Sequence, residues 1–188
     1  MLAEGWKPDD FLKAVALGGA AMAFGIGLWQ YRRAQQWKRA EWIAQEMKQL
    51  LEDPIVQAVF LMIDWGSRRV PLYPTRANET ERNVFLRDAD VARALMLHDD
   101  RPDGFSELET DIRFAFDRLL DGLERFDSYV ATGLVTDSDL AAHLGYWARE
   151  ICSASNTQTE ERLVRLRQYM ESYGFAGALG LLRRIAAV

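Results

Sequence analysis

The stretch LGGAAMAFGIGLWQYRR, Leu17 to Arg33, decides how the whole chain is interpreted. It is almost entirely small and apolar, and it ends in two arginines. Between Phe11 and Trp29 the only charged residue is Lys13. A helix over these ~19 residues is about 28 Å long, close to the ~30 Å thickness of the hydrocarbon core of a bilayer. The sequence therefore predicts a transmembrane helix over residues 11–31.

The residues after this stretch predict its orientation. Trp29 and Tyr31 suit the membrane–water interface, and Arg32 and Arg33 follow them. Basic residues near a span stay on the cytoplasmic side. We therefore expect a single-pass protein of the bacterial inner membrane, with residues 1–10 as a short extracytoplasmic N-terminus and residues 32–188 as a cytoplasmic domain.

Two other interpretations of the stretch remain open. Its alanines and glycines make it only moderately hydrophobic, so it could be the buried helix of a soluble protein. A cleaved signal peptide fits less well, because no basic segment precedes the apolar run and the basic cluster behind it resembles a stop-transfer flank.

Small residues recur every four positions inside the predicted span, at Gly19, Ala23 and Gly27. Such spacing lets helix backbones approach closely in lipid, where close packing drives association. We expect this face to pack against another membrane helix, either from a different membrane protein subunit or from a second copy of the chain.

Composition limits the class of protein. A chain of 188 residues suits one domain with an added anchor. Its net charge of -5 argues against a nucleic-acid binder, which needs a basic surface. The lone Cys152 excludes an intramolecular disulfide, and His98, His143 and Cys152 are too few for an ordinary structural zinc site. No metal or cofactor is predicted.

The rest of the chain predicts a succession of helices. No proline interrupts residues 11–53, so the span can continue into a cytoplasmic helix, and Pro54 suits the first turn of the next. That next segment, PIVQAVFLMIDWG, reads as a short buried helix or else a buried strand. Ser67 to Arg82 is predicted to be irregular, with a brief extended piece near RRVPLY.

Further helices follow this connection and complete the predicted fold. Capping patterns at Ser106 to Glu109 and at Thr136 to Asp139 begin two of them. The remaining helices are predicted over residues 88–98, 159–174 and 175–188. The expected fold is all-α: an N-terminal transmembrane helix that continues into a cytoplasmic helical bundle.

Carboxylates of the longest bundle helix are the first candidates for chemistry. Asp117, Asp121 and Glu124 share a side of this helix. A di-iron bundle would need Glu-x-x-His pairs, which this chain lacks. Arginines lie within helical reach, so we expect an ion-paired, solvated face. The sequence holds no phosphate-binding loop, nucleophile elbow or zinc-protease motif, and no enzyme activity is predicted.

The segment DWGSRR is the second candidate, with Asp64, Trp65, Arg68 and Arg69. An aromatic ring and two arginines near a glycine could contact a partner or bind an anion. The alternative is a helix cap, in which Asp64 pairs with Arg68 or Arg69 and Trp65 fills the core.

Four stretches carry a resemblance to a known family: YRRAQQWKRAEWIAQEM, LMIDWGSRR, IRFAFDRLLDGLERFDSYVATGLV and GYWAREI. On these the chain resembles a family of uncharacterised bacterial membrane proteins with one N-terminal span and a helical cytoplasmic domain. The resemblance implies architecture and location only.

The expected function is that of a membrane-anchored accessory, assembly or regulatory subunit, which acts through protein–protein contacts in a larger membrane complex. Its expected partners are membrane lipid and other membrane protein subunits. The alternative is a membrane-tethered sensor or effector domain that binds a small anion or nucleotide through Arg68 and Arg69.

Overall fold

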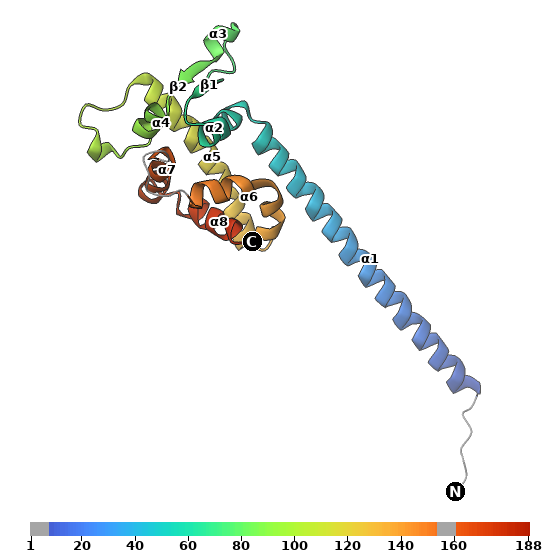
Figure 1. The fold of residues 1–188 in the computed structure, drawn as a ribbon. Helices are drawn as coiled ribbons and strands as arrows, with labels where there is room; N and C mark the ends of the chain where they lie inside the picture. Colours follow the sequence, from blue (N-terminus) through green and yellow to red (C-terminus); the bar gives the residue numbers. More distant parts are fainter. Residues whose placement is uncertain (1–7, 154–160) are drawn as a thin grey trace. The chain divides into compact units, whose positions relative to one another are not determined.

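The computed structural model describes the backbone of residues 8–153 and 161–188, and their side chains except at positions 8–11 and 14. Most of the predicted extracytoplasmic segment, and the start of the helix predicted from residue 159, therefore lie outside the described residues. The chain divides into two compact units, residues 1–42 and residues 43–188. Figure 1 shows the helices of both, coloured along the sequence.

Helix α1 (Pro8–Glu52) is continuous from the first unit into the second. This confirms that the first helix runs on past the predicted span, because no proline interrupts it. The described part of the first unit is this single helix, and its apolar side chains, such as Leu17 and Phe24, are exposed. Among the residues whose side chains are described, no helix has the length and apolar character needed to cross a bilayer.

The second unit begins with the last turns of α1, which supply Ile43, Met47 and Leu50 to its core. These residues lie three and four positions apart and so share one face of the helix. Helix α2 (Pro54–Asp64) follows at once, because the Asp53 side chain accepts a hydrogen bond from the amide of Ile55 at 2.9 Å. The predicted buried helix is confirmed here, and the alternative of a buried strand is wrong.

Helix α5 (Glu107–Ala131) contributes the longest buried stripe of the second unit. Ser106 and Glu109 form the predicted capping box, and Gly133, with a φ of 72°, follows the end of the helix. Helices α2, α4 (Asp88–Ala94) and α8 (Ala176–Ala186) pack against α5. Helix α6 (Asp137–Ser153) packs on α8, and α7 (Glu161–Ser172) packs on α4. The predicted helical bundle is confirmed.

A small antiparallel ribbon of β1 (Arg68–Val70) and β2 (Val84–Leu86) accompanies the helices. A short helix, α3 (Glu79–Arg82), lies between the strands, and the turn η1 (His98–Asp100) follows α4. The predicted extended piece is confirmed, but the prediction that Ser67 to Arg82 is otherwise irregular is wrong. Strand β2 escaped prediction because three residues are too short to show an alternating pattern.

Candidate functional site

The segment DWGSRR begins at Asp64, the last residue of α2, and the side chain of Asp64 is partly buried. Burial raises the pKa of the Asp64 carboxyl above its ordinary value, against the opposing effects of Trp147, Tyr146 and nearby arginines. Asp64 Oδ1 and Trp147 Nε1 are both sealed from solvent, and neither makes a well-formed hydrogen bond. Asp64 is therefore a partly buried group, and its Oδ1 is not accessible to a partner.

The next residues of the segment face outward. Trp65 is 59% exposed, and the guanidinium carbon of Arg68 lies 5.2 Å from the centre of its ring. Arg69 pairs with Phe85 in the ribbon. Because neighbouring residues of a strand point to opposite faces, Arg68 and Arg69 lie on different faces of β1. Within the described residues neither Arg68 nor Arg69 forms an ion pair with Asp64. The structure thus brings Trp65 and Arg68 together but does not gather all four predicted residues into one site.

The predicted helix cap is wrong because another residue already caps α2. Arg162, a buried residue of α7, donates from Nε to the Met62 carbonyl at 3.0 Å and from Nη2 to the Ile63 carbonyl at 2.9 Å. Its Nη1 pairs with Asp88 Oδ1 at 2.5 Å. These contacts satisfy the carbonyls of Met62 and Ile63 near the end of α2. Trp65 is exposed and so does not fill the core.

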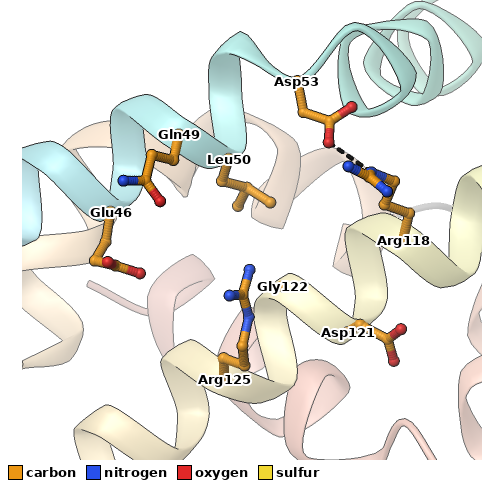
Figure 2. Close-up of a pocket in the computed structure, with 8 residues that line it drawn as sticks. All are labelled: Glu46, Gln49, Leu50, Asp53, Arg118, Asp121, Gly122 and Arg125. Atoms are coloured by element: carbon orange, nitrogen blue, oxygen red, sulfur yellow. Dashed lines mark hydrogen bonds and ion pairs between the residues drawn. The ribbon is translucent and has the colours of Figure 1, made fainter.

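A groove lies between the last turns of α1 and helix α5, and Figure 2 shows the side chains that line it. Its volume is about 410 Å³. The Arg118 Nε donates to Asp53 Oδ2 at 2.5 Å, and Figure 2 shows Arg125 reaching from α5 toward α1. The residues that line it are Glu46, Gln49, Leu50, Asp53, Arg118, Asp121, Gly122 and Arg125.

The groove combines charges of both signs over an apolar contact. A Cβ added at Gly122 would lie 2.6 Å from Leu50 Cδ1, so the Leu50 side chain packs directly on α5 at this glycine. Above this contact, carboxylates from both helices face two guanidinium groups from α5. Such a surface suits the polar rim of a protein–protein contact better than the binding of a single ion.

The three carboxylates of α5 that the sequence singled out have three different environments. Asp117 Oδ1 accepts the Tyr169 hydroxyl at 2.5 Å, and Glu124 Oε1 accepts the amide of Ala178, in the first turn of α8, at 2.8 Å. Asp121 lines the groove. The predicted ion-paired, solvated face is therefore wrong for Asp117 and Glu124, because α7 and α8 cover that side of α5. Burial raises the pKa of Asp117, and burial together with Asp117 raises that of Tyr169.

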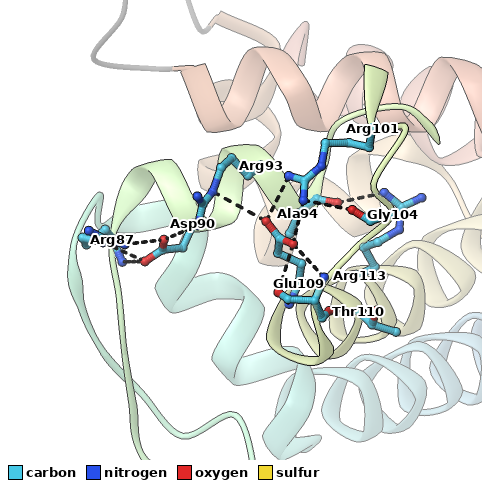
Figure 3. Close-up of polar contacts among 10 residues, drawn as sticks. Arg87, Asp90, Arg93, Ala94, Arg101, Gly104, Glu109, Thr110 and Arg113 are labelled. Carbon is cyan, nitrogen blue, oxygen red and sulfur yellow. Dashed lines mark hydrogen bonds and ion pairs between the residues drawn. The ribbon is translucent and has the colours of Figure 1, made fainter. Parts of the chain in front are cut away.

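A network of charged residues joins α4 to the start of α5, as Figure 3 shows. Glu109 accepts from Arg101 at 3.0 Å and from the Ser106 amide at 2.9 Å, and Asp90 accepts from Arg87 and Arg93 at 3.0 Å. Burial by itself raises the pKa of Glu109. The hydrogen bonds and charges of Ser106 and Arg101 together lower the pKa by more, so the net effect is a lowered pKa. Arg87 lowers the pKa of Asp90 against the effect of burial. The network links α4 to the start of α5 through the Arg93–Glu109 pair. Its two carboxylates already accept hydrogen bonds from arginines, so few of its polar groups are left to bind a ligand.

The structure does not test the roles predicted for residues of the first unit, and these roles stay predictions. In the first unit, a Cβ added at Gly19 or Gly27 would meet nothing within 4 Å, and Ala23 is exposed. Trp29 is 59% and Tyr31 62% exposed. The two basic residues Arg32 and Arg33 are exposed as well, and Arg33 lies 5.4 Å from the ring centre of Trp29.

Histidine and cysteine form no metal site in the part of the chain that the structure describes. The His98 ring meets the Tyr173 hydroxyl at 2.5 Å, and His143 is exposed. Burial raises the pKa of the Cys152 thiol, against the smaller effects of Arg183 and Arg167.

Comparisons of the chain with models of protein families, with curated proteins and with solved structures give no match. The class of protein therefore follows from its fold and sites: a helical domain that carries a mixed-charge groove and is preceded by a long helix with exposed apolar side chains. The resemblance to single-span membrane proteins stays a prediction.

Proposed function

We propose that this chain is a single-pass membrane protein whose helical domain acts through protein–protein contacts, as an accessory, assembly or regulatory subunit of a larger membrane complex. Residues 11–31 would be the anchor, in the bacterial inner membrane, with the N-terminus outside and the domain in the cytoplasm.

The observation that carries this proposal is the distribution of apolar side chains on the first unit. Val15, Met22 and Ile26 lie on one side of α1, and at 3.6 residues per turn Leu17, Phe24 and Leu28 lie on roughly the opposite side. All are exposed, by 41% to 76%. A helix that is apolar on all sides belongs in a protein interior or in lipid. A single helix has no interior of its own, which favours lipid.

The direct test is the distribution of the full chain between membrane and supernatant. We expect it to sediment with membranes at high speed and to require detergent for release. The double variant Met22→Lys and Ile26→Lys should move to the supernatant, because each lysine near the bilayer centre costs about 2.5–3.5 kcal/mol. Trp37→Lys, at a 68% exposed residue beyond the predicted span, is the matched control and should stay in the membrane. Wild-type protein in the detergent-free supernatant would refute the anchor.

The contact function has a separate test on the small-residue face. The double variant Gly19→Leu and Gly27→Leu adds bulk where a neighbouring helix would approach, and we expect it to lose partners that co-purify after gentle extraction. Ala21→Leu with Gly25→Leu adds the same bulk on the other side of the helix and serves as control. Unchanged co-purification of every membrane partner, or equal loss in both variants, would contradict a specific packing face.

The alternative function, a tethered domain that senses a small anion or nucleotide, is favoured by one observation. Among the described residues, Arg68 and Arg69 make no ion pair within the chain, so their charges are available to a ligand. We expect phosphate-bearing probes to raise the melting temperature of the wild type but not of Arg68→Ala. A screen in which no anion shifts the melting temperature would rule this function out.

A further inference from the structure

A second cavity, away from the groove, lies among α5, the turn η1, α7 and the start of α8. We call it the aromatic cleft; it has a volume of about 460 Å³. Small-molecule sites occupy roughly 300–1,000 Å³ and combine apolar walls with a few polar groups. The aromatic cleft has this composition, since its lining residues are His98, Phe105, Thr110, Arg113, Phe114, Asp117, Tyr169, Tyr173 and Phe175.

Of the described residues that line the aromatic cleft, Arg113 is the only arginine. It is 8% exposed, and its Nη1 donates to the carbonyls of Ala94 at 2.8 Å and Met96 at 2.9 Å; Figure 3 shows the Ala94 contact. Its remaining nitrogens, Nε and Nη2, make no hydrogen bond to any described residue, and neither is sealed from solvent. Those two nitrogens form one edge of the guanidinium, the edge that can hold a carboxylate with two parallel hydrogen bonds.

Aromatic rings hold this guanidinium in place. The centres of the Phe105, Tyr169 and Tyr173 rings lie 4.3, 4.7 and 5.0 Å from its central carbon. Rings at these distances fix an arginine and exclude water around it. A buried, preorganised arginine with an open edge binds an anion more strongly than a mobile surface arginine does.

Asp117 limits which anion fits. It lies one helical turn after Arg113 on the same face of α5 and lines the same cleft. Its Oδ1 accepts the Tyr169 hydroxyl, whereas Oδ2 has no hydrogen bond to a described residue and is not sealed from solvent. A purely anionic ligand would be repelled by this carboxylate. A ligand with a cation next to its carboxylate would use both groups.

We propose that the aromatic cleft binds an α-amino acid with an apolar or aromatic side chain. The ligand carboxylate contacts Arg113, and its ammonium group contacts Asp117. Its side chain lies against the rings of the cleft, where Phe114 is 66% exposed at the surface. The inference concerns the second unit only and does not depend on the membrane anchor.

The test uses the full chain in detergent micelles and titration calorimetry with three probes. L-Phenylalanine carries both charged groups, 3-phenylpropionate lacks the ammonium, and 2-phenylethylamine lacks the carboxylate. We expect L-phenylalanine to bind with a Kd below about 1 mM and each analogue to bind at least about tenfold more weakly, since each loses a charge-assisted hydrogen bond. Absence of binding at ~10 mM L-phenylalanine, or equal binding of either analogue, would overturn the proposal.

Two matched variants then assign the binding to the aromatic cleft. Asp117→Asn keeps an oxygen to accept the Tyr169 hydroxyl but removes the charge, and it should weaken L-phenylalanine by about tenfold or more. The same variant should bind 3-phenylpropionate more tightly than the wild type does, because the carboxylate that repels this anion is gone. Asp111→Asn is the control, because Asp111 lies on the same helix and accepts the Tyr73 hydroxyl at 2.7 Å outside this cleft. It should bind L-phenylalanine like the wild type. Unchanged affinity in Asp117→Asn, or equal loss in both variants, would contradict the assigned site.

Discussion

Two methionines on the same helix have opposite environments. Met22, in the first unit, is 70% exposed, whereas Met47, in the second, is 1% exposed. Both belong to α1, which runs through the two units without a break. Helix formation therefore does not depend on burial here. What differs is whether the chain itself supplies apolar neighbours: among the described residues, the buried apolar side chains of α1 begin at Ile43.

The glycines of the two units repeat this contrast. A Cβ at Gly25, in the first unit, would meet nothing within 4 Å, whereas one at Gly122, in the second, would collide with Leu50. Gly122 in the bundle thus marks a point where a side chain of another helix of this chain packs on α5. The small residues of the first unit have room for a neighbour from elsewhere, which is how the proposed packing face would work.

The largest expected effect compares the two methionines directly. Met47→Ala should lower the free energy of unfolding by about 2–5 kcal/mol, because it leaves a cavity in a close-packed core. Met22→Ala, measured in detergent by the same denaturant titration, should change it by less than about 0.5 kcal/mol. Similar losses in the two variants would mean that the first unit has a core of its own.

A second prediction concerns the charges of the bundle. Glu109→Gln should lower stability at pH 7 by about 1–3 kcal/mol, because the amide replaces a carboxylate in a buried network. The native pKa of Glu109 is lowered, so its contribution is complete above the unfolded value of about 4.3 and is lost as the pH falls below it. The variant should therefore lose less stability than the wild type between pH 5 and pH 3 (both approximate).

The control for this prediction is Glu107→Gln, two residues earlier on the same helix. Glu107 is exposed, so its removal should leave the acid dependence close to that of the wild type. Equal acid sensitivity of Glu109→Gln and the wild type would mean that the network contributes nothing to acid stability.

The third prediction concerns the close approach at Gly122. Gly122→Ala forces Leu50 to move and should cost about 1 kcal/mol net, since overpacking costs ~1–3 kcal/mol and alanine regains up to ~1 kcal/mol of helix propensity. Adding Leu50→Ala removes the collision, so a double-mutant cycle should show a favourable coupling of about 1 kcal/mol. Additive effects of the two substitutions would mean that the residues do not meet. Gly25→Ala should leave global unfolding unchanged.

The contrast also explains what the sequence could predict. Helix α2 and the capping box at Ser106 depend on residues within a few positions of one another, so local patterns reveal them. Arg162 lies far along the chain from the Met62 carbonyl that it caps, and nothing in the spacing of the α7 arginines distinguishes it. The aromatic cleft is likewise assembled by packing, because Phe105, Asp117 and Tyr173 come from separate segments. Long-range assembly leaves no local signal, which is why the candidate sites escaped prediction.

The smallest expected effect lies on the outer face of α1, one position after Met47. Lys48 and Glu52 form an exposed ion pair at 3.8 Å, four residues apart, with side chains 68% and 66% exposed. Lysine N-terminal to glutamate is the weaker order for such a pair, so Lys48→Ala should cost at most about 0.2–0.5 kcal/mol. This small loss should vanish at ~1 M salt, which screens exposed charges, whereas the loss from Met47→Ala should persist. A loss from Lys48→Ala as large as that from Met47→Ala would mean that surface charge on α1 contributes as much to stability as the buried stripe of this helix does.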